Sequence, residues 1–142
     1  LNMSTGVAVA SECVSEFELF KLKKQYRYLI FKINDDNTEV VIEKKGEPSA
    51  TYEEFTSCLP DNECRYAVYN FEYDQGSDGK RLKLLFILWA PDTAKIKSKM
   101  MIAGTKDVVK KSLEGIQIEI QGTDKSEVDQ EEVLAKCRSI SR

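Results

Sequence analysis

The spacing of hydrophobic residues in the first third of the chain predicts a helix followed by a β-hairpin. Apolar side chains recur every three or four residues up to about Leu22, as on one face of a helix, and Ser11 is placed to cap it. The members of this stripe are Ala10, Cys13, Val14, Phe17 and Phe20. Residues 26–33 and 38–45 are β-branched and aromatic, and the Asn-Asp-Asp-Asn run between them predicts a turn that pairs them as antiparallel strands.

A capping box and a second hairpin are expected in the middle of the chain. Thr51 with Glu54 three residues later predicts the start of a short helix that ends before Pro60. The side chains expected to face inward from this helix are Tyr52, Phe55 and Leu59. Residues 65–73 and 82–90 predict a hairpin with glycines in its turn, and the second strand is apolar on both faces. That strand is therefore expected near the centre of a sheet that is covered on both sides.

The last third of the chain predicts helices around one further strand. One helix is expected from about Thr93, and a second is expected to be capped at Thr105 and to end near Gly115. Residues 116–121 alternate as a half-buried strand, and the helical crossover before them predicts that they run parallel to residues 82–90. A C-terminal helix is expected to turn inward the stripe Val133, Cys137 and Ile140.

These elements predict a single domain of the α/β class, of α+β type. The sheet is expected to have five strands, mixed but mainly antiparallel, with helices on both faces, and 142 residues suffice to bury its core. Residues 4–142 are expected to form this domain. Leu1 and Asn2 are interpreted as left over from cloning, with Met3 as the native start.

Composition argues against most enzymatic chemistry. The chain has no histidine, so a Ser-His or Cys-His nucleophile is excluded, and no phosphate-binding glycine motif occurs. Catalysis by carboxylates alone remains an alternative. The four cysteines lack metal-ligand spacing and are expected to be buried structural thiols in a reducing compartment, so we expect no metal and no cofactor. The longest apolar run, 84–90, is too short to span a bilayer.

Positive charge is concentrated in one segment of an acidic chain. Residues 93–113 carry a net charge of +5 while the whole chain carries −3, so the remainder carries −8. The lysines of this segment are Lys95, Lys97, Lys99, Lys106, Lys110 and Lys111. This asymmetry indicates an acidic partner surface. Nucleic acid is not expected as that partner, because the pI is about 5.2 and no aromatic residues are interleaved with the lysines.

The apolar residues of the same segment predict how its first helix is oriented. On a helical wheel of residues 93–103, Ile96, Met100 and Ala103 share one side and are expected to face the core. Met101 and Ile102 then fall among the lysines, where methionine would suit an adaptable binding surface. A protein-binding face and a merely solvated lysine face both remain open on these grounds.

Several segments, in order and with matching spacing, resemble the actin-depolymerising factor/cofilin family. They include "YRYLIFKI", "TYEEFTSCLPDNECRYAVYNFEY", "WAPDTAKIKSKMM" and "LEGIQIEIQGTD", and the resemblance runs from Met3 to about Arg138. It implies the ADF-homology fold, binding to actin monomers and filaments with a preference for the ADP state, and severing or depolymerisation of filaments. It does not imply an enzyme. A module that binds filament sides without severing is the nearest alternative.

The resemblance also implies two actin-binding surfaces. The surface for monomers and filaments would contain Ser4, Thr5, Gly6, Val7, Lys97, Lys99, Met100, Met101, Lys110 and Lys111. The surface used only on filaments would contain Arg81, Lys83, Lys136 and Arg138. Ala135 and Ser139 stand where some relatives carry charged residues, which keeps the side-binding alternative open.

Regulation and location are implied by the same resemblance. Thr5 matches the family's phosphorylated hydroxyl residue, with Ser4 beside it, and a phosphate there would oppose an acidic partner. The lysines between 95 and 111 would bind anionic phosphoinositides in competition with actin, and an adaptor responsive to these lipids is a further alternative. A monomer in the cytoplasm, associated with the cytoskeleton, is expected.

Overall fold

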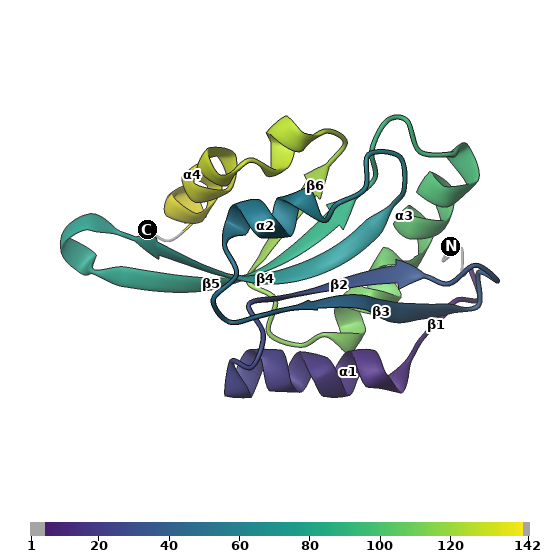
Figure 1. Cartoon of the computed structure of the whole chain (residues 1–142), viewed down its shortest axis with the longest axis horizontal. Coiled ribbons are helices and arrows are strands. Elements are labelled where there is room, and N and C mark those ends of the chain that lie inside the picture. The colour runs from purple at the N-terminus through teal and green to yellow at the C-terminus, as the bar shows by residue number, and fades with distance from the viewer. Residues whose placement is uncertain (1–4, 141–142) are drawn as a thin grey trace.

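In the computed structural model, which describes residues 5–140, six strands form one mixed sheet (Figure 1). The strands are β1 (Ala8–Val9), β2 (Tyr28–Ile33), β3 (Glu39–Gly46), β4 (Arg65–Asp74), β5 (Lys80–Trp89) and β6 (Ile118–Gly122). Their order is β1-β3-β2-β4-β5-β6, in which the four central strands are antiparallel and both edge strands pair in parallel. The predicted hairpins and the parallel pairing of β5 with β6 are therefore confirmed.

The predicted number of strands was too low by one. The additional strand, β1, makes only two pairings with β3, Ala8 with Glu39 and Val9 with Val40. Two residues are too few to produce the alternation of polar and apolar positions by which a strand is recognised in a sequence. Its backbone is nevertheless fixed, because Ala8 and Ala10 donate hydrogen bonds to carbonyl groups of Thr38 and Val40.

Helices cover both faces of the sheet, as predicted. They are α1 (Ser11–Glu18), which continues into a π-helical turn (Leu19–Lys23), α2 (Tyr52–Ser57), α3 (Ile96–Ser112) and α4 (Gln130–Ile140). Short 3-10 turns occupy Gly76–Asp78 and Lys125–Val128. Figure 1 shows α1 and α3 on one face of the sheet and α2 and α4 on the other.

Each face of the sheet has its own hydrophobic core. The core under α1 and α3 includes Phe17, Phe20, Phe31, Tyr66, Phe86, Ile102 and Val109. The core under α2 and α4 includes Tyr52, Phe55, Tyr69, Ile87, Val133 and Cys137. Strand β5 contributes alternate residues to both cores, which confirms that it is covered on both faces. It lies next to the edge strand β6, however, and not at the centre of the sheet as predicted.

The predicted helix starts were partly right. Thr51 caps α2, since its side chain accepts a hydrogen bond of 3.1 Å from the backbone N–H of Glu54. At α1 the N-cap is Ala10, so the prediction that Ser11 caps this helix was wrong. Two apolar residues that were assigned to inner stripes, Val14 and Ile140, are exposed. The buried stripe of each helix is narrower than predicted, because only the side chains that point directly toward the sheet contact it.

The cysteines are free, and three of the four are buried as predicted. Burial raises the pKa of Cys13 to about 12, so this thiol stays neutral and unreactive. Cys58 is only half-buried, and Lys44 Nζ lies 3.2 Å from its sulfur. Among residues 5–140 no helix has the length and apolar character needed to cross a membrane.

Candidate functional site

Helix α3 is one continuous helix, and this corrects the prediction of two helices separated at Thr105. Thr105 lies in the middle of α3 with its side chain fully buried, so it is not a cap. Its hydroxyl lies 2.7 Å from the hydroxyl of Thr5, which gives each group a hydrogen-bond partner. A second anchor comes from the sheet, where Tyr66 donates a hydrogen bond of 2.5 Å to the carbonyl of Ile102.

The predicted orientation of α3 was wrong by half a turn. The buried residues are Ile102, Thr105 and Val109, whereas Ile96 is 74% exposed and Met100 is 68% exposed. Ala103, the third member of the predicted core stripe, is also exposed, and Met101 is partly buried against the core. The physical reason is that α3 carries apolar residues on opposite sides. On its buried side Thr105 forms a hydrogen bond with Thr5 of the N-terminal arm (residues 5–7).

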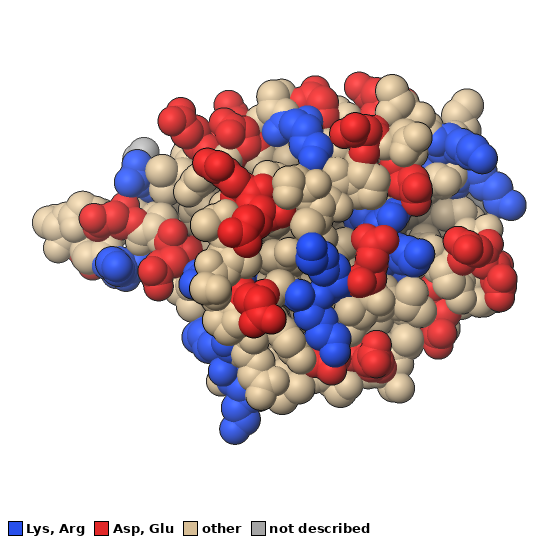
Figure 2. Space-filling model, viewed as in Figure 1, with Lys and Arg blue, Asp and Glu red and all other residues tan. Residues whose placement is uncertain are grey.

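The outer face of α3 therefore combines exposed aliphatic side chains with lysines. Lys97 and Lys111 are exposed and make no ion pair with any residue from 5 to 140. Lys99 is half-buried, and its Nζ donates a hydrogen bond of 2.9 Å to the carbonyl of Asp92. Figure 2 shows Lys and Arg side chains gathered at the right-hand edge, where α3 begins, and Asp and Glu side chains along the upper edge around α2 and α4.

The N-terminal arm lies against α3, as the resemblance implied. Thr5 is half-buried and bonds Thr105, while Val7 is buried in the core beneath α3. A Cβ placed on Gly104 would lie 2.8 Å from Cγ2 of Thr5, so glycine at residue 104 lets the arm approach the helix this closely. Gly6 is exposed beside them, and Ser4 lies outside the described residues.

Three of the four residues assigned to a filament-only surface lie on β5 or α4 near the long β4–β5 hairpin, namely Arg81, Lys83 and Arg138. Figure 1 shows the end of α4 beside this hairpin. Arg138 of α4 donates a hydrogen bond of 2.8 Å to the carbonyl of Asp74, which links the helix to the hairpin. Arg81 donates one of 2.9 Å to the carbonyl of Asp78 within the hairpin, and Lys83 is half-buried. Arg138 thus connects α4 to the hairpin, whereas the bond of Arg81 stays within the hairpin itself.

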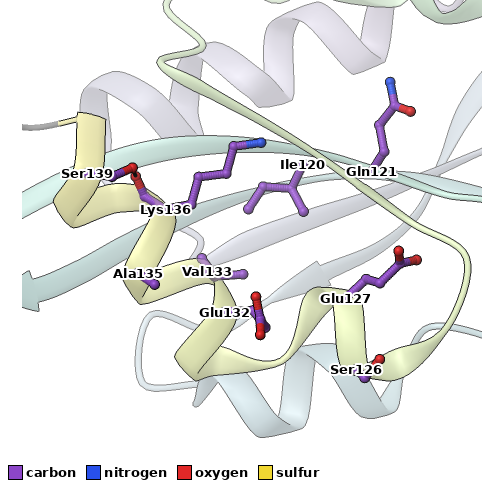
Figure 3. Close-up of a pocket in the computed structure, with 9 residues that line it drawn as sticks. All are labelled: Ile120, Gln121, Ser126, Glu127, Glu132, Val133, Ala135, Lys136 and Ser139. Carbon is purple, nitrogen blue, oxygen red and sulfur yellow. Dashed lines mark hydrogen bonds between the residues drawn. The ribbon is translucent and has the colours of Figure 1, made fainter.

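Lys136 precedes Arg138 on α4 and lies at a hollow between that helix and β6 (Figure 3). The hollow has a volume of about 630 Å³, and its lining includes Glu127, Glu132 and Ser139. Lys136 reaches across it, and its Nζ donates a hydrogen bond of 2.8 Å to the carbonyl of Glu119 on β6. The ammonium group is thus directed at the sheet edge rather than at the hairpin.

Glu119 on β6 is a carboxylate that contacts lysines of α3, and the sequence analysis did not identify it. Its carboxylate pairs with Lys110 at 2.6 Å and with Lys106 at 3.1 Å. Partial burial favours a higher pKa for Glu119, but hydrogen bonds from Lys110, Gln121 and Lys106 outweigh it and lower the pKa to about 2. Lys110, which was assigned to the actin-binding surface, is therefore already paired within the chain.

These ion pairs predict how stability responds to acid. The folded pKa of Glu119 lies below its ordinary value of 4.5, so the pairs stabilise the fold fully above that pH and lose their effect as the pH falls to about 2. Glu119→Gln should lower the free energy of unfolding at pH 7 by about 1–2 kcal/mol, because the carboxylate is only partly buried. Urea unfolding between pH 7 and pH 2 measures this, and a pH dependence as steep as that of the wild type would contradict it.

Comparisons with known proteins identify the family to which these surfaces belong. Residues 6–138 match the family model described as cofilin/tropomyosin-type actin-binding protein. The chain is 51% identical to actophorin of Acanthamoeba castellanii over 134 residues, which covers 94% of this chain and 96% of actophorin. It is 50% identical to cofilin of Mycosarcoma maydis over 134 residues, with the same coverage of both chains.

The fold agrees with the sequence match. The crystal structure of Streptomyces griseoflavus cofilin superimposes with a TM-score of 0.88 at 47% identity, covering 94% of this chain and 98% of that one. Because the family match extends over residues 6–138, it includes α3 and the β4–β5 hairpin. The chain belongs to the actin-depolymerising factor/cofilin family of actin-binding proteins.

Proposed function

We propose that this protein binds actin monomers and filaments, prefers the ADP state, and severs or depolymerises filaments. The observation that carries the proposal is the outer face of α3, where Ile96 and Met100 are exposed beside Lys97. Two relatives, 50% and 43% identical, are named cofilin and actin-depolymerizing factor, which supports the same activity. Binding, and not catalysis, is the activity that these surfaces support.

The chemistry of this face suits a partner with an apolar cleft and an acidic rim. Exposed aliphatic groups lose their contact with water when they enter a cleft, which makes them candidates for the centre of an interface. Lysines at the edge mainly raise the association rate and make it sensitive to salt. Met101 is partly buried in the core, so we assign it to supporting the helix rather than to the centre of the contact.

Cosedimentation with filamentous actin tests the proposal. Wild-type protein should pellet with filaments and release actin into the supernatant. Lys97→Ala combined with Lys99→Ala should weaken binding at least about tenfold at physiological salt, because two rim charges are lost. A matched variant, Lys23→Ala with Lys24→Ala, removes the same charge at the end of the π-helical turn that follows α1 and should bind like the wild type. If both double variants bind equally well, α3 is not the contact.

Severing needs a second contact, for which we propose the hairpin and α4. A single domain that touches two neighbouring subunits can bias their relative orientation and so favour one filament conformation. Arg81→Ala combined with Lys136→Ala should then reduce filament binding and severing while leaving the affinity for monomers unchanged. If this variant still severs, the filament-only surface lies elsewhere. If the wild type decorates filaments and releases no actin, the side-binding alternative is correct.

The nucleotide preference and the response to phosphorylation are tested on monomers. We expect tighter binding to ADP-actin than to ATP-actin, and equal affinities would contradict the preference. A phosphate on Thr5 would add about −1.5 to −2 charge beside the lysines of α3 and would break the bond to Thr105. Thr5→Glu should therefore weaken binding more than Thr5→Ala does, and equal effects would argue against regulation at this residue.

Phosphoinositide binding is proposed for the same lysines. Vesicles that contain anionic phosphoinositides should bind the wild type and be displaced by actin monomers, as expected for overlapping sites. Binding to vesicles that persists unchanged in saturating actin would separate the two sites. We place the protein in the cytoplasm with the actin cytoskeleton, and a fluorescent fusion that fails to follow actin structures would contradict this location.

A further inference from the structure

Lysine side chains from helices on opposite faces of the sheet contact Glu119. It lies on β6, an edge strand, where Lys106 and Lys110 of α3 approach its carboxylate at 3.1 and 2.6 Å. Lys136 of α4 approaches from the other face and donates a hydrogen bond to its carbonyl, and Figure 3 shows this side chain reaching toward β6. One acidic residue thus sits between the two candidate actin-binding surfaces.

This arrangement divides the positive charge of α3 into two parts. Lys97 near the start of the helix and Lys111 in its last turn are exposed and pair with no acid among residues 5–140. In the second half, Lys106 and Lys110 share one carboxylate, whose orientation is fixed by a hydrogen bond of 3.1 Å from Gln121. All three charged groups remain partly exposed, so an acid from a partner can compete for the lysines.

We infer that Glu119 is an internal counter-ion that withholds Lys106 and Lys110 from actin and so sets how strongly the second half of α3 attracts it. The inference rests on the proposed function, in which the outer face of α3 meets actin. Lys110 then contacts actin only by exchanging Glu119 for an acid of the partner. The approach of actin is steered mainly by the unpaired lysines, and Glu119 limits the electrostatic attraction rather than taking part in the contact.

The association rate with ADP-actin monomers at low salt is the quantity that such a counter-ion controls. Glu119→Gln should associate about two- to fivefold faster than the wild type, and the difference should disappear near 1 M salt, where the screening length is about 3 Å. Glu114→Gln is the matched control, since it makes the same charge change nearby on an exposed side chain that forms no ion pair with a described residue. Its rate should change less than twofold. Equal acceleration by both variants would overturn the inference.

A second background keeps the test independent of any change in folding. In a variant that already carries Lys106→Gln and Lys110→Gln, adding Glu119→Gln should leave the association rate unchanged, because no lysine remains to be released. The same acceleration as in the wild type would show that only net charge matters and would overturn the counter-ion role.

The Lys97→Ala and Lys99→Ala variant separates this failure from a failure of the proposed function. If that variant associates slowly while Glu119→Gln and Glu114→Gln behave alike, the surface on α3 is correct and the counter-ion role of Glu119 is wrong. If it associates as fast as the wild type, the surface itself is misplaced, and the inference fails with it.

Discussion

Replacing Ile96 and Met100 by aspartate is expected to weaken actin binding by about a hundredfold or more, with little effect on the fold. Both side chains are largely exposed on the outer face of α3, so the free protein loses few contacts when they are changed. In a complex they would be desolvated at the centre of the interface, where a truncated or charged residue commonly costs 2 kcal/mol or more, about thirtyfold in affinity. Because both positions receive a charge that the complex would bury, the double variant should lose more than thirtyfold in affinity.

Affinity for ADP-actin monomers and urea unfolding measure the two sides of this prediction. Leu22→Asp is the matched control, because Leu22 is 66% exposed at the end of the π-helical turn, outside both candidate surfaces. It should keep wild-type affinity. If the aspartate pair at 96 and 100 binds as tightly as the wild type, or if Leu22→Asp loses as much affinity, the apolar centre has been assigned to the wrong residues.

The contrast between Ile96 and Ile102 explains what could be predicted about α3 from its sequence. The helical character of this region, its lysines and its likeness to a family could be predicted, because they depend on composition and order. Its continuity through Thr105 could not. Which aliphatic side of α3 faces the sheet could not be predicted, because both sides carry residues that could be buried. The deciding contacts come from Thr5, a hundred residues away in the sequence, and from Tyr66 on the sheet.

The sheet shows the same division between local and distant causes. The capping box at Thr51 and the parallel pairing of β6 with β5 follow from a local motif and from the order of consecutive elements, and both predictions are confirmed. Strand β1 and the pairing of Glu119 with Lys106 and Lys110 depend on distant segments meeting in space. A single glutamate in an alternating strand gives no sign of such a partner.

Gly46 illustrates a distant cause with a large energetic consequence. In the sequence it precedes Glu-Pro and resembles a loop glycine, but it ends β3, is buried, and does not adopt a positive φ. A Cβ at this position would overlap the ring of Tyr28. That ring packs against Phe55 and Tyr69, with centroid distances of 5.1 and 6.3 Å, so it has little freedom to move aside. Glycine is required here because an aromatic ring lies directly on the backbone.

Gly46→Ala is therefore expected to lower the free energy of unfolding by about 2–3 kcal/mol, the range found when a well-packed core is forced to accept extra volume. Urea unfolding measures the loss. The same substitution in a Tyr28→Leu background should cost less than about 1 kcal/mol, because the smaller side chain leaves room for a methyl group. An equal cost in both backgrounds would show that Gly46 is needed for its backbone and not for the ring above it. Since Tyr28 lies in the core under α2 and α4, the folded fraction of Gly46→Ala should keep its affinity for actin monomers.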